Sequence, residues 1–429
     1  MNDAVSEVRR ISVCRVCQSD SLEQVLSLGP LALTGVFVRP GQPDPPRVEL
    51  SLGFCEKCAL LQLLSSVDPS SLYAEYWYRS GTNETMRRHL AGIAEDVAGR
   101  VSLGANDICV DIGCNDGTLL QSYGLDNLVL IGVDPSDAIL DIRNPRILAV
   151  NDYFSWESLK QHVGPGKVKA LTSISMFYDL DDPHAFVRDV ALALAPDGVW
   201  VTEMNYTGDL VENVGYDMIS HEHVTYYTIR TFQELVARHG LHLNDVSFSP
   251  INGGSVRLFV SRSARISAAA RDALETEDRK GLAKLQTYVE LGARIERFKS
   301  RLTRYLQGLR GAGRCIAVYG ASTRGNTLLQ HCGLTREVLF AAADRNPGKW
   351  GLEMSGSRIP IMSEADVRTL HPSHLLALPY YFIGEFLARE TSYMQRGGQI
   401  VVPLPALKAY RMENGTMVSE EIGDAGGAP

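Results

Sequence analysis

One local pattern occurs twice in this chain of 429 residues: an apolar run, a glycine-bearing turn, a helix start, and a second apolar run that ends on an acidic residue. The first copy covers residues 107–136, "DICVDIGCNDGTLL" and then "LVLIGVDPS"; the second covers 314–351, from "RCIAVYGASTRGN" to "VLFAAADRNPGKWG". Strands that alternate with helices form mostly parallel sheets, whose ligands gather at the carboxyl ends of the strands. The repeated pattern therefore predicts two Rossmann-like α/β domains.

The first copy has the spacing of a nucleoside site. Asp111 and Asp134 are separated by the interval of one strand–helix–strand unit, so Asp134 falls at a strand's carboxyl end, where an acidic side chain accepts hydrogen bonds from ribose hydroxyls. The turn reads G-x-N-x-G and lacks the third glycine of a dinucleotide fingerprint. A plain tight turn is the alternative, but the strand patterns "RILAVNDYF", "KALTSISMF" and "DGVWVTEMN" follow it. The turn favours a ligand with adenosine and no pyrophosphate.

Two C-x-x-C pairs lie within the first 60 residues, "CRVC" and "CEKC". Four thiolates in two such pairs suit tetrahedral zinc, and the site has no open position for catalysis. Four independent cysteines or a redox dithiol are the alternatives, and two pairs so close together disfavour both. We expect a structural Zn²⁺ that supplies folding energy to a short module; its ligands are Cys14, Cys17, Cys55 and Cys58.

Several segments together resemble a known family. "VDIGCNDGTLL", "GVDPS", "MFYDLDDPHAFVRDV" and "HEHVTYYT", behind the two cysteine pairs, are similar over nearly the whole chain to the class I S-adenosylmethionine-dependent methyltransferases that include the sugar C-methyltransferases. The resemblance implies that Asp134 holds the ribose of the methyl donor. It also implies further cofactor-binding residues: Asp111, Gly113, Asn115 and Gly117 on the methionine and ribose side, and Asp152 and Tyr153 at the adenine.

The segment "YDMISHEHVTYYT" (216–228) lies between a strand that ends near Asn205 and a helix that begins at about Thr228. A loop at the carboxyl edge of a parallel sheet faces the cofactor. If a carbon next to a ketone is methylated, it must lose a proton to a base, and donors must stabilise the enolate oxygen. We expect His223 to be the base, because histidine matches the required pH range. Glu222 is expected to orient it; the expected donors are Tyr76, Tyr78 and Asn205.

Three other interpretations of this loop are weighed. A metal site is disfavoured because no third ligand accompanies the two histidines. A structural role, with the rings capping loop carbonyls, suits His221 as well as catalysis does, and suits His223 less. The same base also serves an O- or N-methyltransferase by deprotonating a hydroxyl or an ammonium group.

The second copy of the pattern is expected to bind phosphate. "GASTRGN" offers backbone amides, hydroxyl groups and a guanidinium at a helix amino terminus. A domain that merely buttresses the cleft is the alternative. The family resemblance implies that this half holds the nucleotide of a nucleotide-linked sugar; the substrate-binding residues would be Gly320, Ser322, Thr323, Arg324 and Asn326.

Composition excludes other classes of protein. The net charge of −8 disfavours nucleic acid as a partner, which counts against a noncatalytic zinc protein that binds RNA. No apolar run approaches the roughly 20 residues of a membrane span, and the amino terminus lacks a secretory pattern, so we expect a cytoplasmic protein. The expected parts are a zinc-binding module (1–69), a doubly wound class I methyltransferase domain (70–263), a helical connector (264–312), a Rossmann-like domain (313–420) and a mobile tail (421–429).

Together these features predict an S-adenosylmethionine-dependent C-methyltransferase. Its expected acceptor is a small molecule, a keto-deoxysugar linked to a nucleoside diphosphate, methylated at C-3 beside a ketone at C-4 through a base-assisted enolate.

Overall fold

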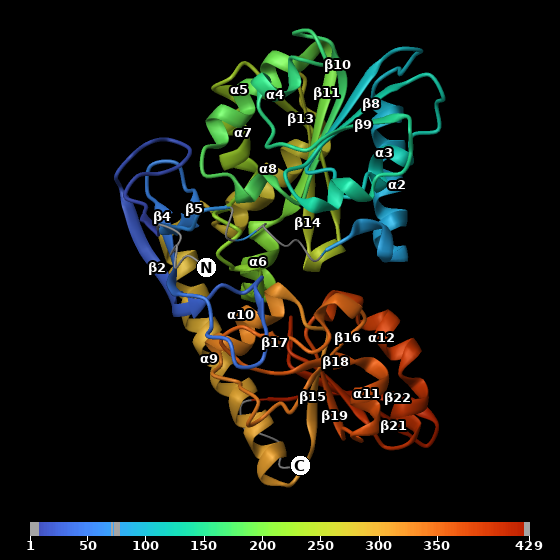
Figure 1. Cartoon of the computed structure of the whole chain (residues 1–429). Coiled ribbons are helices and arrows are strands. Elements are labelled where there is room, and N and C mark those ends of the chain that lie inside the picture. Colours follow the sequence, from blue (N-terminus) through green and yellow to red (C-terminus); the bar gives the residue numbers. More distant parts are fainter. Residues whose placement is uncertain (1–7, 70–71, 73–77, 424–429) are drawn as a thin grey trace.

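A computed structural model describes residues 8–69, 72 and 78–423. Two α/β domains lie one above the other, and a small β module runs along one side of both (Figure 1). The expected α/β class, with a small amino-terminal module, a doubly wound domain and a Rossmann-like domain, is confirmed.

The upper domain is built on a seven-stranded sheet in the order β13-β14-β11-β10-β7-β8-β9. Its strands are parallel except β14, which is antiparallel to both of its neighbours. The bounds are β7 Ile108–Ile112, β8 Val129–Val133, β9 Ile147–Val150, β10 Val168–Ile174, β11 Leu194–Asn205, β13 His242–Ser249 and β14 Ser255–Ser261.

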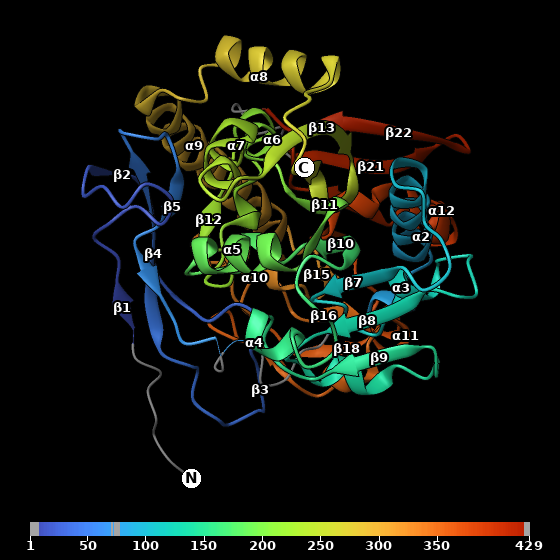
Figure 2. The same cartoon turned by 90° about the horizontal axis from the view of Figure 1, so that it is seen from above.

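Helices cover both faces of this sheet (Figures 1 and 2). On one face lie α2 Glu84–Arg100 and α3 Thr118–Gln121, and on the other α4 Trp156–Leu159, α5 Pro183–Ala193 and α7 Ile229–Ala237. Local signals set their ends: Asp182 caps α5 by accepting from the Ala185 N–H at 3.0 Å, and Thr228 caps α7 in a capping box with Thr231. The loop that contains Glu222 and His223 therefore ends where α7 begins.

The zinc module reaches into both domains through β-pairing. Its sheet has the order β12-β5-β4-β2, with β2 Leu22–Ala32, β4 Arg47–Cys55 and β5 Leu61–Leu63. The fourth strand, β12 (Thr225–Tyr226), begins two residues after His223 and belongs to the upper domain. A second pairing joins β3 (Phe37–Val38) to β17 (Glu353–Met354) of the lower domain. These two pairings thus hold the loop and the lower domain against one module.

The lower domain has a second seven-stranded sheet in the order β18-β16-β15-β19-β20-β21-β22. Five strands are parallel, as in a Rossmann-like fold. The strand β21 is antiparallel to both of its neighbours, β20 and β22. The bounds are β15 Ile316–Tyr319, β16 Ala342–Asp344, β18 Ile361–Ser363, β19 His374–Ala377, β20 Gln399–Val402, β21 Lys408–Glu413 and β22 Thr416–Glu421; the helices are α10 Thr323–His331, α11 Glu364–Thr369, α12 Ile383–Arg389 and α13 Thr391–Gln395.

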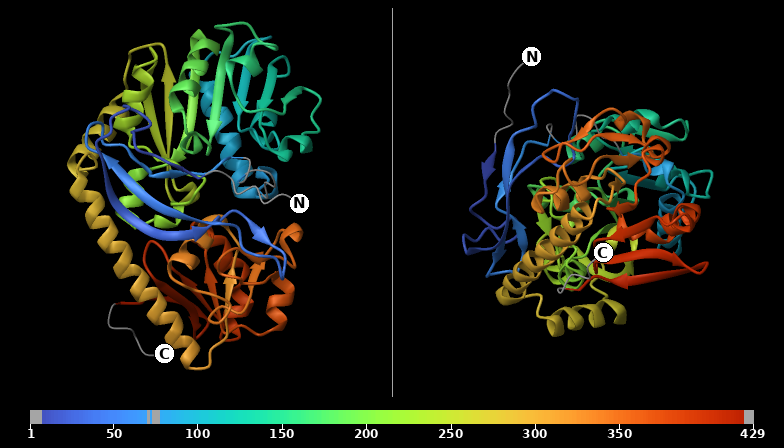
Figure 3. Two further views of the ribbon diagram at one scale, coloured as in Figure 1. Left: turned by 60° about the vertical axis from the view of Figure 1, so that its left-hand side comes forward. Right: turned by 90° about the horizontal axis from the view of Figure 1, so that it is seen from below.

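Two helices connect the domains. The shorter, α8 (Ala268–Lys280), is followed by the 27-residue α9 (Leu285–Gly311), which runs down the side of the molecule and contacts both β2 and β15 (Figure 3). A buried row at helical spacing, including Tyr288, Leu291, Ile295, Phe298 and Leu302, explains why α9 stays packed along its length.

The carboxyl-terminal segment is ordered further than expected. Glu421 closes β22, and the Ile422 N–H donates to the Leu407 carbonyl at 2.8 Å, with the Ile422 side chain buried. The rest of the predicted tail, 424–429, lies outside the described residues. Across the described part of the chain, no helix is both long and apolar enough to cross a membrane.

Candidate active site

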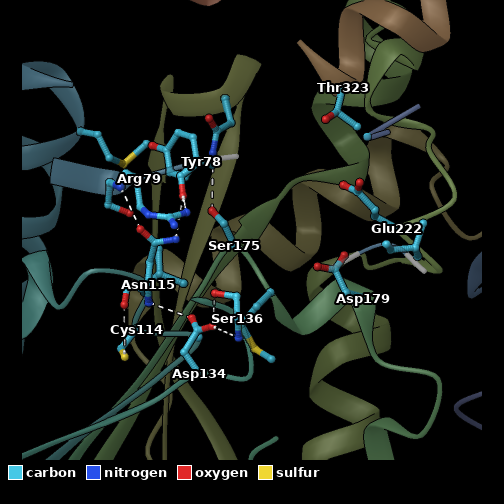
Figure 4. A pocket seen from close by; sticks show the side chains of 18 of the residues that line it. Tyr78, Arg79, Cys114, Asn115, Asp134, Ser136, Ser175, Asp179, Glu222 and Thr323 are labelled. Carbon is cyan, nitrogen blue, oxygen red and sulfur yellow. Dashed lines mark hydrogen bonds between the residues drawn. The ribbon is translucent and has the colours of Figure 1, made fainter. Parts of the chain in front are cut away.

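A cavity of about 890 Å³ opens where the three parts of the chain meet. It lies at the carboxyl ends of β7, β8, β10 and β11, the edge at which parallel sheets bind ligands. Residues from the zinc module (Gly35, Phe37), the upper domain and the lower domain (Ser322, Asn346) all line it. In Figure 4, Tyr78, Asn115 and Asp134 lie on one side, and Asp179, Glu222 and Thr323 on the other.

The first side of the cavity is organised around Asp134. One of its carboxylate oxygens accepts from the Asn115 N–H at 2.8 Å, and the other accepts from the N–H and hydroxyl of Ser136 at 2.8 and 2.6 Å. These bonds fix the carboxylate at the end of β8 and leave acceptor capacity for a diol. Gly113, with φ +68°, brings the backbone close to the cavity, because a Cβ there would lie 3.0 Å from Met176 Cγ.

The predicted cofactor residues divide into two groups. Asp111, Gly113, Asn115, Asp134 and Tyr153 line the cavity. Asp111 is buried, accepts from the Thr172 hydroxyl at 2.6 Å, and has a pKa raised to about 7, mainly by burial. Asn115 also ties down the chain above the cavity, because its side chain accepts from the Ser80 N–H and donates to the Tyr78 carbonyl.

Two predicted cofactor residues do not line the cavity: Gly117 and Asp152. Gly117, with φ +74°, caps α3 and faces Ile142 and Ile147, so its role is to turn the chain. Asp152 is exposed, and its carboxylate accepts from the neighbouring Tyr153 N–H at 2.8 Å. Of the pair predicted at the adenine, only Tyr153 lines the cavity.

On the other side of the cavity, His223 is locked in one orientation. Its Nδ1 lies 2.6 Å from the Met218 carbonyl, so Nδ1 carries a proton and donates it, which leaves the lone pair on Nε2. The ring stands edge-on to Tyr178 at 4.4 Å between centroids. Burial, with a smaller contribution from the Arg324 cation, lowers the pKa of His223 to about 4. The imidazole is therefore neutral at physiological pH.

Glu222 does not orient His223 as expected, because the ring's Nδ1 is already bonded to Met218. Its carboxylate instead lies against the zinc module and the lower domain: a Cβ on Gly35 would fall 2.2 Å from Glu222 Oε1 and 3.6 Å from the Thr323 methyl group. Burial raises the pKa of Glu222 to about 7. Glu222 and His223 thus present two separate basic atoms to the cavity.

His221 has the structural role that was one of its two interpretations. It is 2 % exposed, Nε2 lies 3.1 Å from the Val48 carbonyl, and it does not line the cavity. The loop therefore sends Glu222 and His223 to the cavity and His221 into the zinc module.

Of the expected donors, Tyr76 falls outside the described residues. Tyr78 is 43 % exposed on the Asp134 side of the cavity, and the Asn205 amide donates to the Asn252 carbonyl at 3.2 Å while lining the cavity. Tyr178, which packs on His223, was not singled out, since nothing in "MFYDLDD" distinguishes a cavity tyrosine from a core one.

In the lower domain, the phosphate site expected around "GASTRGN" is only partly present. Ser322 and Thr323 line the cavity. Asn326 is fully buried and donates to the Thr34 and Ser355 carbonyls, and Gly320 lines a separate pocket of about 150 Å³, so neither is positioned to bind a ligand in the main cavity. Arg324 lines the cavity, but all three of its nitrogens already donate to groups of this chain.

Two cations of the lower domain that line the cavity were missed, Arg345 and Lys349. The Lys349 ammonium donates to the Ala321 carbonyl at 2.8 Å and lies over the Phe37 ring. Arg345 is exposed and has no ion-pair partner among the described residues. Both follow the acidic residue that ends β16, in "DRNPGKW", a position where the sequence offers no motif.

Comparison with known proteins gives three family matches along the chain. A zinc binding domain matches residues 14–73, a methyltransferase domain matches 82–246, and a C-methyltransferase C-terminal domain matches 250–405. The chain is an S-adenosylmethionine-dependent methyltransferase. The resemblance seen in the sequence is thereby confirmed.

One relative matches nearly the whole length of this methyltransferase. C-methyltransferase NovU of Streptomyces niveus is 28 % identical over 416 residues, which are 95 % of this chain and 99 % of NovU. Among solved structures, mitomycin 7-O-methyltransferase MmcR overlaps 42 % of the chain and 55 % of its own at 14 % identity and a TM-score of 0.34. Geranyl diphosphate C-methyltransferase of Streptomyces coelicolor A3(2) overlaps 42 % of this chain and 81 % of its own, at 16 % identity and a TM-score of 0.32. With TM-scores this low, neither structure supports an inference about function.

The methyltransferase has residues that fit both of its cofactors. For S-adenosylmethionine, the buried Asp134 carboxylate and the Cβ-free turn at Gly113 suit a ribose and the chain attached to it. For zinc, the sulfurs of Cys14, Cys17, Cys55 and Cys58 all lie within 4.8 Å of one another. Tetrahedral Zn–S bonds of about 2.3 Å require sulfurs about 3.8 Å apart, and two of these pairs are at 3.5 Å. With four thiolates, the ion is structural.

Proposed function

We propose that this methyltransferase transfers a methyl group to a carbon atom next to a ketone, in a keto-deoxysugar linked to a nucleoside diphosphate, at C-3 of a 4-keto sugar. The observation that carries the proposal is the neutral imidazole of His223, whose only lone pair is on Nε2 and which lines the same cavity as Asp134. The name of NovU and the match to a C-methyltransferase C-terminal domain support carbon as the acceptor atom.

His223 has a role that O-methylation of an acidic hydroxyl would not need. In the proposed reaction, Nε2 removes a proton from the carbon beside the ketone, and the electron pair of that C–H bond becomes the enolate. The enolate carbon then attacks the sulfonium methyl group in line with the leaving sulfur, giving the C-methyl ketone and S-adenosylhomocysteine. The cavity's contribution is to hold both reactants in contact and to exclude water.

The low pKa of His223 is consistent with this role. In the free protein the ring stays unprotonated, so every molecule has the base form available at neutral pH. Proton transfer creates an imidazolium next to an enolate, and opposite charges in a buried site stabilise each other, which raises the effective basicity in the transition state. Asn205 and Tyr178 line the same cavity, and they are proposed as hydrogen-bond donors to the developing enolate oxygen.

The nucleotide is proposed to extend from the sugar toward the lower domain. Ser322 caps α10 and Thr323 begins it, so this helix directs its amino terminus at the cavity. Arg345 adds a guanidinium without an ion-pair partner in the described part of the chain. A diphosphate placed between them would be held by backbone amides and one cation, and Arg324, which is already paired, would not bind it directly.

The test is to incubate the zinc-loaded enzyme with S-adenosylmethionine carrying a ¹³C methyl group and a series of nucleoside-diphosphate 4-keto-deoxysugars. The expected product shows one-bond coupling between the labelled methyl and a sugar carbon, assigned to C-3 by NMR. A labelled methyl bonded to oxygen or nitrogen would reject the proposed acceptor atom. Equal turnover of the sugar without its nucleotide would reject the proposed role of the lower domain.

A further inference from the structure

A buried ion pair joins the lower domain to the loop that bears the base. Arg324, in the first turn of α10, places Nε 3.0 Å and Nη2 2.9 Å from one oxygen of Asp217, in the 3-10 turn η4 (Tyr216–Met218) of the upper domain. The side chains are 11 % and 2 % exposed. The second oxygen of Asp217 accepts from the Tyr380 hydroxyl at 3.2 Å, so both partners of the pair are satisfied.

The residue after Asp217 holds the imidazole. The Met218 carbonyl is the acceptor of the His223 Nδ1–H at 2.6 Å, and no other group of the described chain bonds to that nitrogen. A short 3-10 turn has little rigidity of its own, because it contains one backbone hydrogen bond or two. Its fixed position here comes from α10, which packs against it and supplies Arg324.

We propose that the Asp217–Arg324 pair is a positioning device for the base: by fixing η4 it fixes the Met218 carbonyl, and through that carbonyl the direction in which His223 presents Nε2. The inference rests on the proposed function, since it takes His223 as the base. It gives the lower domain a second task beside substrate binding. On this proposal, the His223 ring is held in its orientation only when the lower domain is packed against the upper domain.

Other features of Arg324 agree with positioning better than with ligand binding. Its Nη1 donates to the Asn252 carbonyl in the turn between β13 and β14, and its guanidinium lies 5.1 Å from the centre of the Tyr381 ring. A phosphate bound there would have to displace Asp217, a carboxylate that is itself buried. Arg324 therefore links three segments of the chain.

Electrostatics give the pair a signature that packing alone lacks. The charged and titratable groups that line the cavity with His223 are Arg324 from α10, Tyr178 and Asp179 from the turn at 177–179, and the adjoining Glu222; Asp217 from η4 is paired with Arg324. The Arg324 cation lowers the pKa of His223, so neutralising it with Arg324→Gln raises that pKa. Asp217→Asn leaves the cation without its counterion and shifts the pKa the opposite way.

The experiment uses the full-length, zinc-loaded enzyme with histidine labelled in ¹⁵N, and His223→Asn to assign the ring signals. In the wild type, we expect His223 to be the Nδ1–H tautomer over the whole neutral range. In Arg324→Gln and Asp217→Asn, we expect a mixture of tautomers and opposite pKa shifts. Tyr380→Phe removes one hydrogen bond to Asp217 and should give a smaller fraction of the other tautomer than the two charge variants. It replaces them in the test if they do not fold.

Activity supplies the second readout. The variants at Arg324 and Asp217 should lose about 100-fold in kcat, with the affinity for S-adenosylhomocysteine within about threefold of wild type. Arg336→Gln, an exposed arginine of the same domain, is the control and should leave all values unchanged. An unaltered tautomer in the folded variants, or pKa shifts of the same sign, would overturn the inference. Because the tautomer is read without an acceptor, failure of the proposed reaction leaves this test intact.

Discussion

The cofactor side of the cavity makes the most quantitative prediction. Asp134→Asn keeps the size of the side chain but leaves only one oxygen to accept. In the wild type, both oxygens are used: Asn115 N–H binds one at 2.8 Å, and Ser136 binds the other through N–H and hydroxyl at 2.8 and 2.6 Å. In the variant, the amide N–H₂ faces one of these donors, and the ribose loses its charged acceptor.

The expected cost follows from one lost hydrogen bond to a charged group, about 1.5–3 kcal/mol. This corresponds to roughly a 10- to 150-fold weaker binding of the cofactor. The assay is calorimetric titration of the zinc-loaded protein with S-adenosylhomocysteine. Asp152→Asn is a matched control, because it makes the same change of charge at a residue that does not line the cavity. Wild-type affinity in Asp134→Asn, or an equal loss in Asp152→Asn, would refute this account of the cofactor site.

Three further predictions follow from buried or crowded groups. The pKa of Glu222 is raised from 4.5 to about 7, so between these pH values the native state binds one more proton than the unfolded state, and the free energy of unfolding falls as pH rises. Urea titration should therefore show Glu222→Gln to be more stable than wild type at pH 8 by up to about 3 kcal/mol. Near pH 4.5 the two proteins should be equally stable. Cys58→Ser should release zinc, lower the melting temperature and reduce the hydrogen-exchange protection of β12, the strand that pairs with β5 and follows the loop containing His223. Cys315→Ser, at an exposed cysteine, should have none of these effects. Gly35→Ala must displace the Glu222 carboxylate and should reduce turnover without changing cofactor affinity; Gly92→Ala, where a Cβ meets nothing within 4 Å, should be silent in the same kinetic assay.

The elements that could be predicted from the sequence are those coded locally. The strand–turn–helix units around Gly113 and Gly320, the cap at Thr228 and the cysteine pairs each depend on residues that are neighbours in the chain. Their physical signals, such as apolar periodicity, caps and ligand spacing, are complete within a short window. The class of fold, the zinc site and a site for an adenosine-containing ligand followed from them, whereas S-adenosylmethionine was implied by the family resemblance.

The contacts that could not be predicted join distant segments with weak local signals. β12 and β3 are two-residue strands whose partners lie in other parts of the molecule, and no pattern of two residues marks a strand. The acceptor of the His223 proton is a backbone carbonyl, which any residue in place of Met218 could supply. Arg324 at a helix amino terminus suggested a phosphate site. Its actual partner, Asp217, lies 107 positions earlier, so no local pattern indicated the ion pair.

The central claim, that His223 removes a proton from carbon, is tested most directly by isotope exchange. The enzyme is incubated in deuterated water with S-adenosylhomocysteine and a nucleoside-diphosphate 4-keto sugar, so that no methyl group can be transferred. NMR should show deuterium entering at C-3 with the wild type, and at no more than the protein-free rate with His223→Asn, whose affinity for S-adenosylhomocysteine serves as the folding control. Exchange that continues at the wild-type rate in His223→Asn would contradict the assignment.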